Sequence, residues 1–105
     1  MALTKINSAG IDGLTSDSEL NQSGGSGTSN TAFGKNAGDS IASGGNYNVA
    51  LGENAATALA TGDDNIAIGY GALDAADGAE SDNIAIGSNA LGNVNHDSVV
   101  NNIAI

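Results

Sequence analysis

The chain has 105 residues, enough for one domain, but 18 are alanine, 16 are glycine and three are aromatic. Such small side chains bury little apolar surface, which argues against an ordinary multilayer globular core. The chain is therefore either disordered or gains its core by stacking on itself and on other copies. The net charge of −10, with two lysines and no arginine, argues against nucleic acid and an anionic membrane surface as partners. No apolar run approaches the roughly 20 residues of a membrane span.

The first 29 residues follow no regular pattern. Their apolar side chains, among them Leu3, Ile6, Ile11 and Leu14, are unevenly spaced between Ser, Asp, Asn and Gly. Residues 23–27 have the Gly/Ser composition of a flexible linker. We therefore expect residues 1–29 to form an attachment segment that becomes ordered on a partner.

Residues 30–105 repeat one short motif. It starts at Asn30, Asn48, Asn65, Asn83 and Asn102, which are 18, 17, 18 and 19 residues apart. The first four copies read Asn-x-Ala-x-Gly and the fifth reads Asn-Ile-Ala-Ile, and in the first four an alanine recurs three residues after the glycine. This regularity predicts a stack of similar units, about four and a half in number, in which each depends on its neighbours.

Each motif predicts a β-strand, because its two large apolar residues are two positions apart and would point to the same face. We expect these pairs to face the interior, and the alanine between them to face another layer or subunit. The predicted core residues are Phe33, Val49, Leu51, Ile66, Ile68, Ile84, Ile86, Ile103 and Ile105, with Thr31 as a weaker member.

The residues after each strand predict a sharp turn. A glycine is expected where the strand bends or where two backbones approach closely. The residue two positions later is Asn or Gly, the types that tolerate a positive φ. The predicted turn residues are Gly34, Gly52, Gly69 and Gly87, followed by Asn36, Asn54, Gly71 and Asn89.

A weaker apolar position follows in each repeat. It lies seven residues after the glycine, at Ile41, Leu59, Ala76 and Val94, and the last two repeats add Leu73 and Leu91. These positions predict a second, poorer strand, closed by an acidic or amide-rich loop. Stacking such units would also align the asparagines that open the strands as a ladder.

The motif Asn-Ile-Ala-Ile-Gly, with its Gly/Asp/Asn-rich loop, resembles the repeats of bacteriophage tail fibres and is similar to the head repeats of trimeric autotransporter adhesins. The resemblance covers residues 30–105 and implies an all-β homotrimer, a β-roll or β-solenoid of 17–19-residue units. The period is longer than that of adhesin heads, and the opening residues lack the apolar run of a signal peptide. Both departures favour a phage fibre, and residues 1–7 resemble the starts of phage structural proteins, particularly those of cyanophages.

A phage fibre implies partners and a location. Residues 1–29 would dock to tail, baseplate or nozzle proteins, and residues 30–105 would begin a stiff trimeric shaft in the virion, assembled in the host cytoplasm. Because the last motif breaks off at Ile105, in the middle of a strand, we expect the chain to be the front part of a longer polypeptide. Its distal tip would bind the host surface receptor.

Two other functions are compatible with stacked strands. A bacterial cell-surface trimeric adhesin would bind through the surface of the repeats, and its full-length gene would encode a signal peptide and a membrane anchor. An ice-binding solenoid would need a regular outward ladder of threonine, whereas the central position of the motif is alanine in all five copies.

No enzyme is predicted. The chain has a single histidine, His96, no cysteine, and neither a Gly-x-Ser-x-Gly elbow nor a phosphate-binding loop. Asp63, Asp64, Asp77 and Asp82 lie in Gly-rich loops and are oxygen ligands of the kind that Ca²⁺ prefers. The Gly-Gly-x-Gly-x-Asp pattern of calcium-binding rolls is missing, however, so no catalytic, cofactor or metal site is assigned.

Overall fold

The computed structural model describes residues 20–21, 27–75, 78–93 and 100–105. The predicted attachment residues Leu3, Ile6, Ile11 and Leu14 lie outside the described residues, and so do Ala76 and Val94 of the second apolar position. The described part of the chain is all-β and contains no helix.

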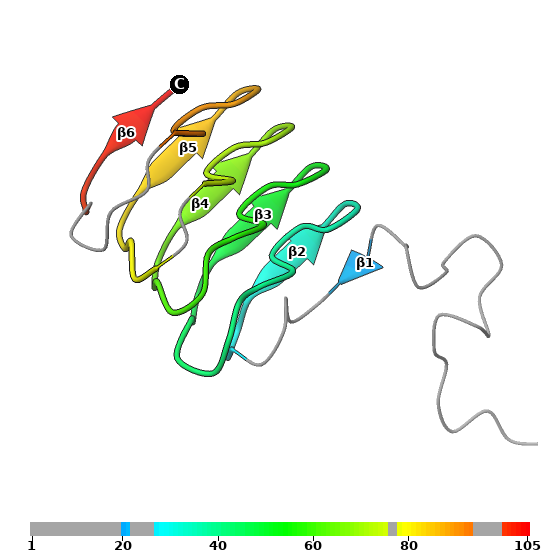
Figure 1. Ribbon diagram of the computed structural model, residues 1–105, viewed down its shortest axis with the longest axis vertical. Coiled ribbons are helices and arrows are strands. Elements are labelled where there is room, and N and C mark those ends of the chain that lie inside the picture. The colour runs from blue at the N-terminus through cyan, green and yellow to red at the C-terminus, as the bar shows by residue number, and fades with distance from the viewer. Residues whose placement is uncertain (1–19, 22–26, 76–77, 94–99) are drawn as a thin grey trace, which may run out of the picture.

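Six short strands form one sheet in the order of the chain (Figure 1). They are β1 (Leu20–Asn21), β2 (Thr31–Phe33), β3 (Val49–Leu51), β4 (Ile66–Ile68), β5 (Ile84–Ile86) and β6 (Ile103–Ala104). Strands β2 to β6 run parallel, and β1 pairs antiparallel with β2. The strand prediction is therefore confirmed for all five copies of the motif.

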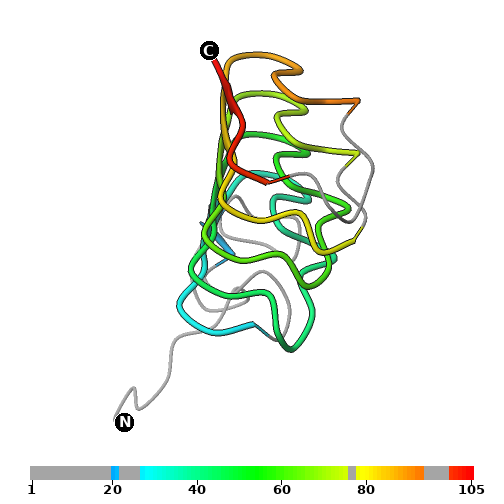
Figure 2. The ribbon, with the colours of Figure 1, turned by 90° about the vertical axis from the view of Figure 1, so that its left-hand side faces the viewer.

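The parallel strands keep the motif in strict alignment. The residue before the central alanine always pairs with its equivalent, as Val49 does with Ile66 and Ile66 with Ile84. Between strands the chain makes a return path beside the sheet, and Figure 2 shows these paths stacked as successive turns. This regular stacking places each position of the motif in a column along the stack.

The two faces of the sheet are the reverse of the prediction. In β3, β4 and β5 the central alanine is buried, whereas the residues on either side of it are only half-buried. In β2 both Thr31 and Phe33 are exposed around a buried Ala32. The prediction that the large pairs face the interior is thus wrong for the single chain. This correction applies to Phe33, Val49, Leu51, Ile66, Ile68, Ile84, Ile86, Ile103 and Ile105.

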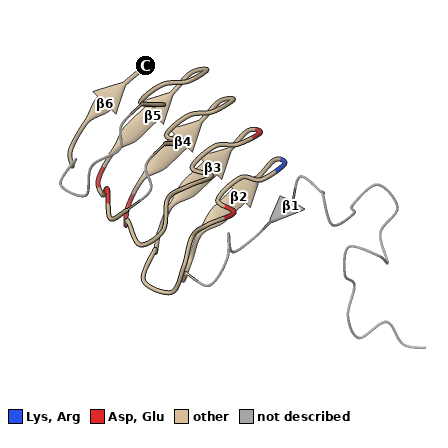
Figure 3. Cartoon of the chain, in the orientation of Figure 1, with Lys and Arg blue, Asp and Glu red and all other residues tan. Residues whose placement is uncertain are grey.

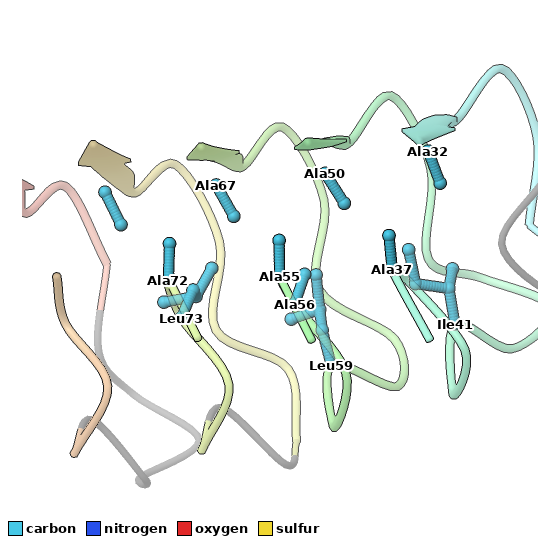
Figure 4. Close-up of a cluster of buried hydrophobic side chains, with 11 residues drawn as sticks. Ala32, Ala37, Ile41, Ala50, Ala55, Ala56, Leu59, Ala67, Ala72 and Leu73 are labelled. Atoms are coloured by element: carbon cyan, nitrogen blue, oxygen red, sulfur yellow. The ribbon is translucent and has the colours of Figure 1, made fainter. Parts of the chain in front are cut away.

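The reason is that alanine builds the interior of the stack (Figure 4). The strand alanines face a second column of fully buried alanines in the return path, Ala37, Ala55 and Ala72. With these two walls so close, methyl groups fill the space between them and a larger residue would overpack it. The alternation of a strand then turns the large residues outwards.

The return path carries the remaining core. Ile41, Leu59 and Leu73 are buried there, and none of them belongs to a strand. Leu91 is partly buried against the same core. The predicted second strand is therefore absent from the described part of each return path, although its apolar positions at Ile41 and Leu59 do face the interior.

The turn residues have the conformations expected from their types. The strand-ending glycines have φ between 125° and 129°, at Gly34, Gly52, Gly69 and Gly87. The second turn position has φ between 58° and 63°, at Asn36, Asn54, Gly71 and Asn89. A further positive-φ column, at Gly38, Ala56, Leu73 and Leu91, has no constant residue type and was not predicted.

Candidate functional site

The outward face of strands β2 to β6 is the candidate functional site, and we call it the outer face. Its first column consists of Thr31, Val49, Ile66, Ile84 and Ile103, which pair in succession. Its second column consists of Phe33, Leu51, Ile68, Ile86 and Ile105. Two residues of one strand on the same face are about 7 Å apart. The outer face is therefore a narrow strip, two side chains wide and five rungs long, where a rung is the pair of outward residues of one motif.

The outer face is almost entirely apolar and open. Phe33 is 46% exposed, Ile103 70% and Ile105 91%, while the side chains of the middle rungs are half-buried by one another. All the described strands belong to one sheet, so no described strand packs over this face. A continuous exposed apolar strip is a usual mark of an interaction surface.

A buried asparagine ladder holds the strands of the outer face in register. The backbone N–H of Asn48 donates to Oδ1 of Asn30 at 2.8 Å, and the N–H of Asn65 donates to Oδ1 of Asn48 at 2.9 Å. The same bonds join Asn65 to Asn83 and Asn83 to Asn102, at 3.0 Å each. In every step the Nδ2 of the later asparagine donates to the same Oδ1. The predicted ladder is confirmed.

The same asparagines tie each strand to its return path. Nδ2 of Asn48 donates to the carbonyl oxygen of Gly62 at 2.8 Å, and Nδ2 of Asn65 donates to that of Glu80 at 2.7 Å. Asn48 and Asn65 are each 1% exposed, so these bonds are shielded from water. A ladder that binds both along the stack and across it makes the sheet a rigid support for the outer face.

A second ladder, which we call the corner ladder, joins the residues that lie two positions before each asparagine, and its bonds are donated in the opposite direction along the stack. The backbone N–H of Thr28 donates to Oδ1 of Asn46 at 2.9 Å, and that of Asn46 donates to Oδ1 of Asp63 at 2.8 Å. The N–H of Asp63 donates to Oγ of Ser81 at 3.0 Å. Sequence reasoning missed this ladder because Asn, Asp and Ser share one role in it.

The loop carboxylates are candidate calcium ligands, but no metal site is assigned to them. One carboxylate oxygen of Asp63 accepts a main-chain hydrogen bond, and Asp77 lies outside the described residues. Within the ranges that the structure describes, no three His, Asp or Glu side chains gather as a metal-binding group.

Charge is kept away from the outer face. The described strands contain no charged residue, and the acidic residues of the described ranges lie, like Lys35, in the turns and loops (Figure 3). The outer face can therefore approach another apolar surface without desolvating a charge. The arrangement is suited to packing against another apolar surface.

The comparisons with known proteins add no relative. No protein-family model, no curated protein and no solved structure matches the chain. No helix in the described ranges is long and apolar enough to cross a membrane.

Proposed function

We propose that the chain is a structural subunit of a phage tail fibre. Residues 30–105 form a β-solenoid at the start of a homotrimeric shaft, and residues 1–29 dock to tail, baseplate or nozzle proteins. The shaft presents a distal tip to the host receptor. The observation that supports this proposal is the outer face, an uncovered apolar strip on a stack of repeats that has little core of its own.

The distribution of apolar residues favours assembly over a single chain. Of the eleven buried apolar residues in the described ranges, eight are alanine. The larger side chains are mostly on the outer face, where the isolated chain leaves them half-buried or exposed. Fully burying a large aliphatic side chain stabilises by about 1.5–3 kcal/mol, so copies that cover one another's outer face gain burial that alanine methyl groups supply only weakly.

The mass of the particle in solution tests the assembly. We expect sedimentation equilibrium to give three times the chain mass of 10.1 kDa at micromolar concentration. A mass of 10.1 kDa under these conditions would contradict the trimer. Electron microscopy of virions labelled with an antibody to the repeats tests the location, because label along a tail fibre is expected. Label on a bacterial surface would favour the adhesin.

The double variant Ile66→Thr and Ile84→Thr is expected to weaken assembly without unfolding the chain. Both positions lie in the first column, where Thr31 already stands in a strand. Losing about 1 kcal/mol per substituted side chain, at six sites in a trimer, raises the chain concentration for half-assembly by roughly 100-fold. Analytical ultracentrifugation over a concentration series measures this shift.

Tyr70→Thr is the matched control for the double variant. Tyr70 is 56% exposed at a turn and lies outside the outer face, so its replacement removes apolar surface without touching the strip. We expect its half-assembly concentration to stay that of the parent. An equal loss of assembly in the control and in the double variant would argue against the outer face as the contact surface.

A further inference from the structure

We propose that, in the assembly, the first column of one copy packs against the second column of the neighbouring copy, rung by rung and with all copies pointing the same way. Thr31 of one copy then lies against Phe33 of the next, Val49 against Leu51, and Ile66 against Ile68. This inference rests on the proposed self-assembly and specifies which side chains meet.

The two columns differ in a complementary manner. The first rung combines the smallest side chain of the outer face, Thr31, with the largest, Phe33. The second rung combines Val49 with the longer Leu51, and the next two rungs are Ile with Ile. A small residue in one column is thus matched by a large one in the other, which is the condition for an evenly filled interface.

A closed ring of identical copies requires two different contact surfaces on each chain, one for each neighbour. The outer face has two such contact surfaces, because its columns are about 7 Å apart along the strands and lie on either side of the buried alanines. Packing the first column on the neighbour's second column uses both surfaces of every copy. Packing like columns together would set Phe33 against Phe33 and Thr31 against Thr31, with overpacking in one place and a void in the other.

The alignment follows from the first two rungs. In register, Thr31 meets Phe33 and Val49 meets Leu51, so each small side chain faces a larger one. A shift by one repeat brings Phe33 opposite Val49 and leaves Thr31 without a large partner. An antiparallel arrangement moves Thr31 away from Phe33 and places its hydroxyl against isoleucines, where an unbonded polar group is costly.

Single cysteines test the inference cleanly, because the chain has none of its own. Thr31→Cys and Phe33→Cys are made in separate full-length chains, which are assembled alone and as an equimolar mixture. A bifunctional thiol reagent is used that is short enough to join facing side chains across the roughly 10 Å between packed sheet faces. We expect linked dimers from the mixture, and several-fold fewer from either variant alone.

A mixture of Thr31→Cys with Ile103→Cys is the directional control, because these residues are at opposite ends of the first column. It should yield no cross-link between the two variants. Efficient linking in either single variant would show that like columns meet, and linking between residues 31 and 103 would show antiparallel copies; both results overturn the inference. An assembly of trimer mass in which no combination of variants is cross-linked would also overturn the inference, but it would leave the proposed function standing. A monomeric mass overturns both.

Discussion

Gly69→Ala is expected to destabilise the protein by about 1–3 kcal/mol more than Gly87→Ala, although both glycines have the same φ. That φ is 125° at each position. A Cβ added to Gly69 would lie 2.7 Å from the carbonyl carbon and from the oxygen of Gly87, which are backbone atoms of the next repeat. Apart from Gly87 itself and its two chain neighbours, no atom of the described residues lies within 4 Å of a Cβ added there.

The comparison separates two costs that usually occur together. A side chain at this φ carries a backbone strain of about 1–3 kcal/mol, which both variants share. The difference between the variants then measures the clash between stacked repeats alone. Urea unfolding at equal protein concentration gives both values, since assembly makes stability depend on concentration. Equal losses would mean that the glycine column does not set the spacing of the repeats.

The strands and turns could be predicted because local chemistry determines them. Asn65-Ile-Ala-Ile-Gly69 contains an alternating apolar pair followed by a residue free to adopt any φ, and this pattern recurs at nearly constant spacing. The Asn or Gly two residues after that glycine tolerates the left-handed region in any fold. The structure confirms both features in each repeat where they were expected.

Which face of the strand is buried could not be read from alternation alone. A period of two shows that Ile66 and Ile68 share a face, but it does not say what the opposite face meets. The usual preference of large apolar residues for the interior then gave the wrong side. The recurring alanines three residues after each glycine, such as Ala55 and Ala72, were the available signal. They form the wall that leaves room only for methyl groups.

The corner ladder could not be predicted from the sequence for a different reason. Its acceptors, Asn46, Asp63 and Ser81, share only an oxygen atom at the right place. A pattern search finds repeated residue types, whereas a hydrogen bond requires a repeated function that several types supply. The asparagine ladder was predictable because it needs a donor and an acceptor on one short side chain at every step, and asparagine meets that need in all five copies.

Asn65→Leu is expected to destabilise the protein by about 3–6 kcal/mol, because this buried side chain makes five hydrogen-bond contacts and a hydrogen bond is worth about 0.5–1.5 kcal/mol. In these contacts the two N–H groups of Nδ2 are shared among three acceptors. Its Nδ2 donates to Oδ1 of Asn48 and to the carbonyl oxygens of Asp63 and Glu80. Its Oδ1 accepts from the backbone N–H and from Nδ2 of Asn83. Leucine has a similar size but removes all five bonds in a site that is 1% exposed.

Asn102→Leu is the matched control at the last step of the ladder. The side chain of Asn102 is only half-buried, and its Nδ2 donates to Oδ1 of Asn83 and to the carbonyl oxygen of Val100. With two bonds in place of five, we expect a loss of about 1–2 kcal/mol. Since a domain is stable by only about 5–15 kcal/mol in total, Asn65→Leu should remove the cooperative urea transition or shift it strongly, while Asn102→Leu keeps it. Similar midpoints for the two variants would show that the strand pairs, and not the buried amides, hold the repeats together.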